Sequence, residues 1–271
     1  MGTTQTDYVL GTDEAELARL GLQHRVWRES MLRAWRRAGL TVGWRVVDVG
    51  AGPGYATLDL AEVVGSTGAV LAVERSENFR GSLSKERDRR GLDQIEILGV
   101  DLMESAPPGG YDMTWCRWVA SFVSSVPRLV QWISGALRPG GRAVFHEYVD
   151  YASWRFAPPR PQLQAFVTEV MASWREAGGE PDVAPELIGA LADQGLSVLE
   201  VRPLAFATRP TELTWQWPAR FVATNARRLL ELGRVTPEWV RSVVAELEQA
   251  EANPHSVMVT PLVLEVIAER Q

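Results

Sequence analysis

The chain has 271 residues, 46% of them hydrophobic, so it can bury a substantial core, and its length suits one elaborated domain better than two ordinary ones. The formal net charge of -6 argues against a surface built to neutralise phosphates, and we expect no nucleic-acid partner. Because Cys116 is the only cysteine and no apolar run reaches the roughly 18 residues of a membrane span, we expect no disulfide, no membrane partner and a cytoplasmic location.

A helical spacing of apolar residues runs from Glu14 to Arg37, and we expect residues 1–43 to form a helical lid segment. Strands and helices then alternate. Apolar runs predict strands at residues 45–50, 69–74, 94–100, 111–116 and 142–148, with helices from about Tyr55, through Arg90 and up to Leu137. Continuously apolar strands are typical of a parallel sheet covered by helices on both faces. Residues 44–151 are therefore predicted to form the α/β core, a doubly wound sheet.

The strict alternation stops after Tyr151. We expect a helical cap insertion at residues 152–194, a core strand within 195–208, a second helical cap insertion at 209–258 and the final core strand at 259–271. No internal repeat or low-complexity linker separates these segments, so we interpret the insertions as caps on the sheet rather than as independent domains.

Gly50, Gly52 and Gly54 follow the first predicted strand. Without side chains they allow a sharp turn and a close approach of backbone amides to a ligand, although a tight turn without any ligand is an open alternative. Tyr55 stands where the dinucleotide fingerprint requires its third glycine, which weakens a nicotinamide interpretation. The only lysine, Lys85, lies outside this loop, which excludes a P-loop.

Three acidic residues accompany the glycine loop. Glu74 ends the second strand about twenty residues further on, where a carboxylate accepts hydrogen bonds from the two hydroxyls of a ribose. Asp101 follows the third strand and is placed to accept from an adenine amino group. Asp48, within the first strand, is expected to brace the glycine loop through backbone amides. A nucleoside held without a phosphate cradle is what S-adenosylmethionine presents.

The successive segments VVDVGAGPGYATLDLAE, AVERS, GVDLME, YDMTWCRWVASFV and LRPGGRAVFHEY resemble the motifs of class I S-adenosylmethionine-dependent methyltransferases of the small-molecule type. The resemblance covers residues 46–150 and implies a Rossmann-like sheet of seven mostly parallel strands, the last of them antiparallel. It implies S-adenosyl-L-methionine as cofactor, S-adenosyl-L-homocysteine as its product, and the following cofactor-binding residues: Tyr8, Asp48, Gly50, Ala51, Gly52, Gly54, Glu74, Arg75, Asp101, Leu102, Arg117 and Trp118.

An acceptor that must lose a proton can need a general base, and candidates for this catalytic role end the fifth core strand. His146 has a suitable ordinary pKa, but strand alternation can equally turn it into the core and leave Glu147 or Tyr148 at the mouth of the site. No cluster of carboxylates follows the fourth strand, so we expect no metal. We interpret Cys116 as core packing.

Aromatic residues are frequent in the predicted caps, and they can wall a closed pocket for an apolar or planar small molecule or form the caps' own core. The candidates for substrate binding are Tyr151, Trp154, Trp215 and Trp217. We therefore expect a methyltransferase that acts on oxygen, nitrogen or carbon of a small molecule. The alternatives are an NAD(P)-dependent oxidoreductase and a protein that binds S-adenosylmethionine without transferring its methyl group. The oligomeric state is open, with a homodimer as one option.

Overall fold

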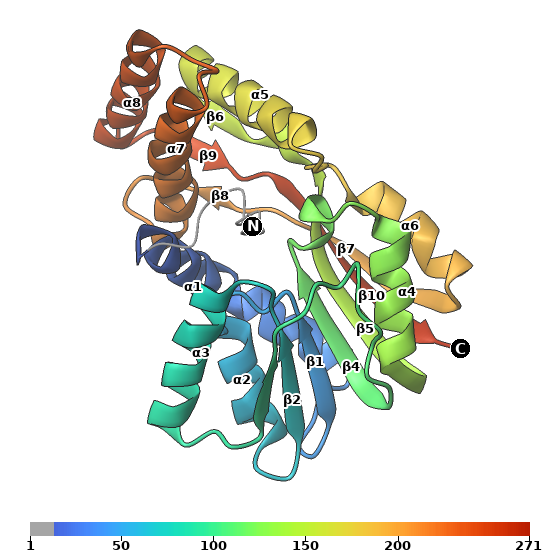
Figure 1. The fold of residues 1–271 in the computed structure, drawn as a ribbon. Helices are drawn as coiled ribbons and strands as arrows, with labels where there is room; N and C mark the ends of the chain where they lie inside the picture. Colours follow the sequence, from blue (N-terminus) through green and yellow to red (C-terminus); the bar gives the residue numbers. More distant parts are fainter. Residues whose placement is uncertain (1–13) are drawn as a thin grey trace, which may run out of the picture.

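The structure, a computed structural model, describes residues 14–271 and is built on one large sheet (Figure 1). The strands of this sheet are β1 (Arg45–Val49), β2 (Ala69–Val73), β3 (Ile95–Leu98), β4 (Tyr111–Arg117), β5 (Leu137–Asp150), β7 (Leu196–Leu204) and β10 (Leu262–Arg270). Their order is β3-β2-β1-β4-β5-β10-β7. The first five are parallel neighbours, whereas β10 runs antiparallel to both β5 and β7. The seven-stranded, mostly parallel Rossmann-like sheet that the sequence predicts is confirmed.

Helices cover both faces of this sheet, because each contributes an apolar stripe to one of two buried clusters. The helices are α1 (Glu14–Arg37), α2 (Tyr55–Val64), α3 (Glu77–Arg90), α4 (Val126–Ala136) and α6 (Ala184–Asp193). Trp35 of α1 and Leu60 of α2 pack on one face, and Leu129 of α4 and Leu187 of α6 pack on the other. The sheet is therefore doubly wound, and its strands need no polar face.

The order of the strands reverses between β1 and β4. The chain moves outward from β1 to β2 and β3, then returns to place β4 on the other side of β1. As a result, the helix that follows β1 packs on one face of the sheet, and the helix that follows β4 packs on the other face. The loops that follow β1 and β4 therefore diverge. Open α/β sheets bind ligands in the crevice formed there, at the carboxyl ends of the strands.

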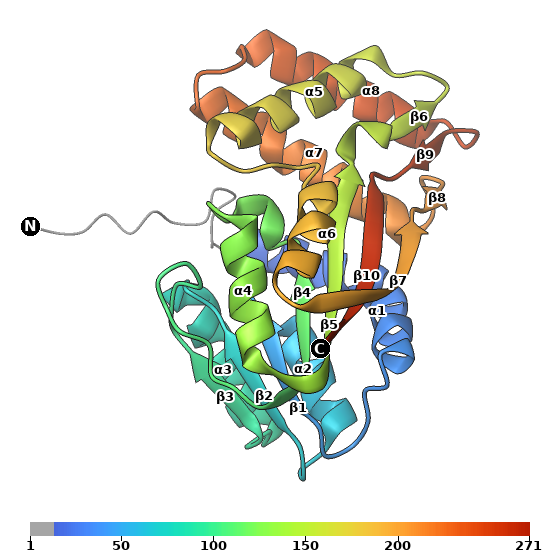
Figure 2. The same ribbon diagram turned by 90° about the vertical axis from the view of Figure 1, so that its right-hand side faces the viewer.

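A cap sits beyond the carboxyl edge of the sheet (Figure 2). It consists of helices α5 (Pro161–Glu176), α7 (Leu213–Glu231) and α8 (Pro237–Ala252) with a small antiparallel sheet of β6 (Arg155–Ala157), β9 (Val257–Val259) and β8 (Ala207–Thr208). One buried cluster contains Trp27 of α1, Tyr148 of β5 and Phe221 of α7. Since this core runs without interruption from the sheet into the cap, the cap is packed on the sheet.

The segment 152–194, expected as a purely helical cap insertion, divides differently in space. It begins with β6, and its last helix, α6, packs on the large sheet beside α4 rather than in the cap. Leu187 and Leu191 of α6 are buried with α4 residues, which explains its position. The small sheet escaped prediction because strands of two or three residues are too short to show an alternating pattern.

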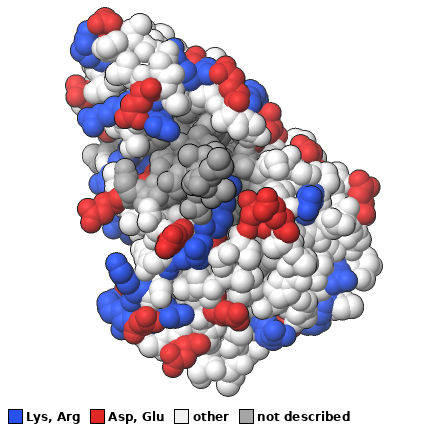
Figure 3. All heavy atoms as spheres, in the orientation of Figure 1, with Lys and Arg blue, Asp and Glu red and all other residues white. Residues whose placement is uncertain are grey.

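The surface carries charges of both signs. On the face shown in Figure 3, Lys and Arg side chains are interspersed with Asp and Glu side chains. Exposed apolar residues gather on the edge strand β7, where Val198, Leu199 and Val201 are 39%, 50% and 43% exposed. Within residues 14–271, no helix has both the length and the apolar character needed to span a membrane.

Candidate functional site

A cavity of about 410 Å³ opens where the strand order reverses. Residues from the carboxyl ends of β1, β2 and β4 and from the loop after β3 surround it. Most of the residues expected around a nucleoside line it together: Asp48, Gly50, Ala51, Gly52, Glu74, Arg75, Asp101, Leu102, Arg117 and Trp118. The fold thus gathers side chains that lie up to seventy positions apart in the sequence.

The glycine loop is tied to the end of β2 by the Glu74 carboxylate. Oε2 of Glu74 accepts from the Gly52 amide at 2.8 Å, and Oε1 accepts from the Ser76 amide at 2.8 Å. A carboxylate has about four acceptor positions, so each oxygen keeps capacity for a further donor. Glu74 therefore fixes the loop and still presents acceptors to the cavity.

The glycines of this loop serve two different purposes. A Cβ on Gly52, which has φ of +56°, would meet no heavy atom within 4 Å, so the backbone there faces open space. A Cβ on Gly54 would lie 2.2 Å from Cδ1 of Leu83 in α3. Gly54 does not line the cavity, which corrects its assignment as a cofactor-binding residue: its smallness allows α2 and α3 to pack closely.

Asp48 braces the helix that follows the glycine loop, through Thr57, rather than the loop itself. Its Oδ2 accepts from the Thr57 hydroxyl of α2 at 2.6 Å, so the brace goes to the first turn of the helix beyond the glycine loop. Burial raises the pKa of Asp48 to about 7. The carboxyl borders the cavity, where a ligand carrying a positive charge would favour its ionised form.

The loop after β3 supplies a second acidic acceptor. Oδ1 of Asp101 accepts from the Met103 amide at 2.8 Å, which fixes the side chain in the loop. Its Oδ2 lies 3.8 Å from the Arg75 guanidinium. With Leu102 beside it, this corner of the cavity offers both polar and apolar contacts.

The backbone is strained where β4 ends. Trp118 has φ of +54°, the only positive φ among the described residues other than glycine. A bulky residue rarely adopts this conformation, and such strain costs about 1–3 kcal/mol. The Trp118 amide donates to the His146 carbonyl at 3.0 Å, which holds the turn. The strained turn aims the indole between two cavities.

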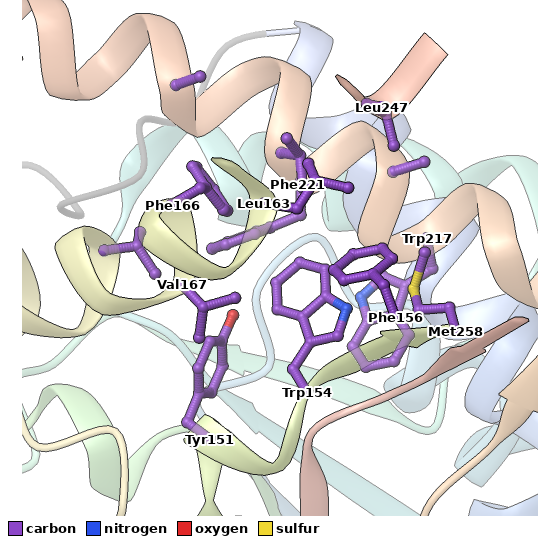
Figure 4. Packing of buried hydrophobic residues seen from close by; sticks show 14 of the residues in the cluster. Tyr151, Trp154, Phe156, Leu163, Phe166, Val167, Trp217, Phe221, Leu247 and Met258 are labelled. Atoms are coloured by element: carbon purple, nitrogen blue, oxygen red, sulfur yellow. The ribbon is translucent and has the colours of Figure 1, made fainter. Parts of the chain in front are cut away.

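A smaller cavity of about 30 Å³ adjoins the first, with Gln23, Trp118 and Phe122 lining both. Its walls are mainly aromatic. Trp118 stacks on Tyr148 with ring centroids 5.5 Å apart and on Trp217 at 5.9 Å. Tyr151, Trp154 and Phe221 of the same cavity lie among the buried aromatic rings drawn in Figure 4. Of the expected substrate-binding residues, Tyr151, Trp154 and Trp217 line this cavity.

Trp215 lies elsewhere. Its side chain is fully buried, and its indole N–H donates to Glu251 of α8 at 3.2 Å. It lines neither cavity and belongs to the internal core of the cap, which corrects its assignment as a substrate wall. Helical geometry explains the difference from Trp217, because residues two apart on a helix point to different sides.

His146 is fully buried in the sheet and lines neither cavity. Its Nε2 lies 3.0 Å from Oε2 of Glu265 on β10, and that glutamate also pairs with Arg37 of α1. Burial lowers the pKa of His146, so the ring is neutral at neutral pH. This position corrects its assignment as a candidate base: it is a structural histidine that joins β5, β10 and α1.

Glu147 is also buried away from both cavities. Its Oε1 accepts from the amides of Val119 and Ala120 at 2.8 and 2.9 Å, and its Oε2 accepts from the Ser121 hydroxyl at 3.3 Å. Burial raises the pKa of Glu147 to about 7. Its carboxylate organises the turn after β4, which corrects its assignment as a base. Among the three candidates, Tyr148 alone borders a cavity.

Other expected residues fall outside this geometry. Tyr8 lies outside the described residues. Cys116 is buried, and burial raises the pKa of its thiol well above the ordinary value. Among residues 14–271, no group of three or more His, Cys, Asp and Glu side chains is arranged to hold a metal ion.

Helix α1 contributes residues that sequence reasoning did not select. Gln23 lines both cavities, and its Oε1 accepts from Arg19 and from the Trp217 indole, each at 3.0 Å. Leu20 lines the larger cavity. No spacing in the sequence signals the contact between Gln23 and Trp217, which are 194 positions apart.

Comparison with known protein families identifies a domain within the chain. Residues 47–145 match the family model described as a methyltransferase domain. A demethylmenaquinone methyltransferase of Staphylococcus aureus (strain MRSA252) is 28% identical over 123 residues, which are 45% of this chain and 49% of the relative. The chain thus spans about half the length of this curated relative.

Solved structures share the fold over most of the chain. The [4+2]-cyclase SpnF has a TM-score of 0.56 at 20% identity, covering 90% of this chain and 80% of its own. The geranyl diphosphate C-methyltransferase of Streptomyces coelicolor A3(2), solved with Mg²⁺, geranyl-S-thiolodiphosphate and S-adenosyl-L-homocysteine, has a TM-score of 0.58 at 14% identity, covering 92% and 77%. At these identities the likeness concerns the fold, which hosts more than one chemistry.

Proposed function

We propose that the protein transfers a methyl group from S-adenosyl-L-methionine to a small-molecule acceptor. The premise is that the chain carries a class I S-adenosylmethionine-dependent methyltransferase domain. One observation carries this proposal. Glu74 holds Gly52 at the strand reversal and keeps acceptor capacity toward a cavity of about 410 Å³, into which the Gly52 backbone opens.

The residues present fit this cofactor. A side chain at position 52 would project into the space beside the loop, so glycine leaves room for a ligand close to the backbone. Glu74 offers acceptors for ribose hydroxyls, and Asp101 with Leu102 offers a polar and an apolar contact for a purine. The volume lies within the usual range of small-molecule sites, about 300–1,000 Å³.

When bound, S-adenosylmethionine supplies an electrophilic methyl carbon on a positively charged sulfur. The residues of the chain position and shield the reactants. Trp118, fixed by its strained turn, lines both cavities. An acceptor in the smaller cavity would therefore reach the methyl group by passing along the Trp118 indole. Since His146 and Glu147 are occupied elsewhere, rate enhancement comes chiefly from orientation and exclusion of water.

The aromatic walls support a planar, apolar acceptor. Trp118, Tyr148 and Trp217 stack face to face, and a flat ring system can insert among such rings with favourable offset contacts. The smaller cavity holds about 30 Å³, so an acceptor must displace side chains of the cap to enter. The cytoplasmic location and the homodimer remain predictions from the sequence.

The ribose contact provides the first test. Glu74→Gln replaces one acceptor oxygen by an amide that cannot accept from a hydroxyl, and we expect about a tenfold or greater loss of affinity for S-adenosylhomocysteine, measured by isothermal titration calorimetry. Glu77→Gln, on the exposed first turn of α3, is the matched control and should leave the affinity unchanged. Equal affinity in wild type and Glu74→Gln would contradict the assignment.

A second measurement separates the alternatives. S-adenosylmethionine should raise the melting temperature of the wild type and NAD should not, whereas the reverse would favour an oxidoreductase. Mass spectrometry of small-molecule mixtures incubated with the protein and the cofactor should then reveal a product heavier by one methyl group. Tight cofactor binding without any methylated product would favour a protein that uses the cofactor in another way.

A further inference from the structure

The side-chain amide of Gln23 has a fixed orientation. Its Oε1 accepts from Nη1 of Arg19 and from the indole N–H of Trp217, each at 3.0 Å. Guanidinium and indole groups are donors only, so the oxygen of the amide, and not its nitrogen, must face them. The two N–H donors of Nε2 therefore lie on the other side of the amide. Among the residues that the structure describes, none accepts a hydrogen bond from them.

Arg19, the first of these two donors, is itself held in place. Its Nε and Nη2 donate to the Glu16 carboxylate at 2.7 and 2.6 Å, and both side chains are buried. Its guanidinium also lies 5.7 Å from the ring centroid of Phe221 in the cap. Hydrogen bonds that run in series polarise one another, so the bond from Arg19 makes the amide of Gln23 a stronger donor.

Gln23 stands where the two cavities meet. Together with Trp118 and Phe122 it lines both of them. With the cofactor in the larger cavity and the acceptor in the smaller one, the methyl group crosses at this junction. The amide donors of Gln23 are therefore available to the part of the acceptor that lies beside the reacting atom.

The smaller cavity contains further donors that lack acceptors. The indole N–H groups of Trp118 and Trp154 are buried and have no partner within residues 14–271. An unsatisfied buried donor costs about 1–3 kcal/mol. Since an acceptor must displace side chains to enter a cavity of about 30 Å³, its entry brings these donors into reach. None of the described residues that line this cavity is Asp or Glu, so the site has a surplus of donors that ligand oxygens would satisfy.

We propose that the acceptor bears an anionic oxygen, a phenolate or an enolate, and that Gln23 and Trp118 donate to this oxygen where the two cavities meet. The inference rests on the proposed function, because it needs the cofactor in the larger cavity. The stacked rings of Trp118, Tyr148 and Trp217 favour a flat conjugated system as the carrier of the oxygen. An anion gains most from such donors, because hydrogen bonds to an ionised acceptor are about twice as strong as those to a neutral one.

Such an acceptor requires no general base within the site. Its proton passes to bulk water before it binds. An electron pair of the oxygen, or of the carbon conjugated with it, then forms the bond to the methyl carbon, while the carbon–sulfur bond breaks and its electron pair stays on sulfur. The charges of the anion and of the sulfonium cancel in this step. The engagement of His146 and Glu147 elsewhere agrees with it.

The probe for this site is 4-nitrophenol, which ionises near neutral pH and absorbs visible light chiefly as its anion. Its dissociation constant and the pKa of the bound probe are measured by absorbance with S-adenosylhomocysteine at saturation. Wild type should lower the pKa of the bound probe by about one unit, which corresponds to about a tenfold preference for the anion.

Two related probes test the oxygen itself. 4-Nitroanisole has the same ring but cannot ionise, and it should bind about tenfold or more weakly than nitrophenolate. 4-Nitrobenzoate represents a carboxylate acceptor and should also bind more weakly than nitrophenolate. The opposite order for nitrobenzoate would overturn the assignment to a phenolate or enolate.

Gln23→Glu is the decisive variant. Its carboxylate can still accept from Arg19 and Trp217, so the link between α1 and α7 persists, but an acceptor of like charge replaces the donors. The affinity for nitrophenolate should fall about 10- to 100-fold, while that for S-adenosylhomocysteine stays within about threefold. Gln164→Glu on α5 is the matched control and should change neither affinity, because Oε1 of Gln164 also accepts from an arginine and the residue lines neither cavity.

Gln23→Met separates the donor role from a structural role. It breaks the bridge to Trp217 and removes the donors without adding a charge, so it should weaken nitrophenolate binding less than Gln23→Glu does. The reverse order would indicate a structural link and overturn the proposal. Loss of S-adenosylhomocysteine affinity in Gln23→Glu would overturn it too, because the amide would then serve the cofactor. Failure of wild type to bind S-adenosylhomocysteine would instead refute the proposed function.

Discussion

Gly52 and Gly54 stand two positions apart, have positive φ and answer to different constraints. The first faces open space beside a cavity, and the second faces the side chain of Leu83. The sequence spacing identifies the loop but predicts a cofactor-binding role for both glycines. It cannot separate them, because the packing of α3 against the loop is a feature of the tertiary structure. The two roles are distinguished by what a Cβ atom added at each glycine would meet: open space at Gly52 and the Leu83 side chain at Gly54.

This difference is testable by alanine substitution. Gly54→Ala adds an overpacked Cβ to an unfavourable φ and should reduce the free energy of unfolding by about 3 kcal/mol. Gly52→Ala carries only the backbone cost, about 1–2 kcal/mol, but places a methyl group in the ligand space and should weaken S-adenosylhomocysteine binding about tenfold or more. Urea unfolding and calorimetry measure the two quantities, and equal loss of stability in both variants would contradict the distinction.

Glu74, Asp101 and Arg117 were predictable as cavity residues because each lies at the end of an apolar strand or within three residues after it. Parallel strands end at one edge, so Glu74, Asp101 and Arg117 had to converge there. The choice among His146, Glu147 and Tyr148 was not predictable in the same way. The alternation of side chains along a strand places His146 and Tyr148 on the same face of the sheet. Only the tertiary structure shows that His146 is paired with Glu265 and that Glu147 accepts from the turn after β4.

At the scale of elements, the apolar runs located the sheet and its helices because each strand of the core is buried on both faces. The cap followed no comparable rule. Trp215 and Trp217 occupy one turn of α7, yet the first packs inside the cap and the second faces α1 and the smaller cavity. Which side of α7 meets α1 depends on how the cap docks on the sheet, and that is set by contacts between residues far apart in the sequence.

The docking of α7 leads to a prediction about the acceptor. Trp217→Ala removes a stacked wall of the smaller cavity and the hydrogen bond to Gln23, so KM for the acceptor should rise about tenfold while the affinity for S-adenosylhomocysteine changes less than twofold. Trp239→Ala, on α8 and lining neither cavity, is the matched control for loss of an indole in the cap. Similar kinetic effects in the two variants would show that the cap acts only through its stability.

For the molecule as a whole, buried ionisable groups make stability depend on pH in opposing ways. Burial lowers the pKa of His24 and His146, so the unfolded chain binds protons more readily and stability falls as pH drops below about 6.5. Burial raises the pKa of Asp48 and Glu147 to about 7, so the native state holds protons that the unfolded chain releases near pH 4. The stability from these carboxyls is complete at low pH and is lost as pH rises through 7.

Glu147→Gln isolates one of these contributions. Glutamine does not titrate, its oxygen can accept from the Val119 and Ala120 amides, and its NH₂ can donate to the Ser121 hydroxyl, so the turn after β4 should persist. The free energy of unfolding of wild type minus that of Glu147→Gln should therefore fall by about 2 kcal/mol between pH 5 and pH 8, measured by urea unfolding at several pH values.

Because Glu147 borders neither cavity, methyl transfer by the variant should stay within about threefold of wild type, an effect of less than 1 kcal/mol on the barrier. Parallel stability curves would contradict the raised pKa, and a loss of turnover at unchanged cofactor affinity would return Glu147 to the role of a base.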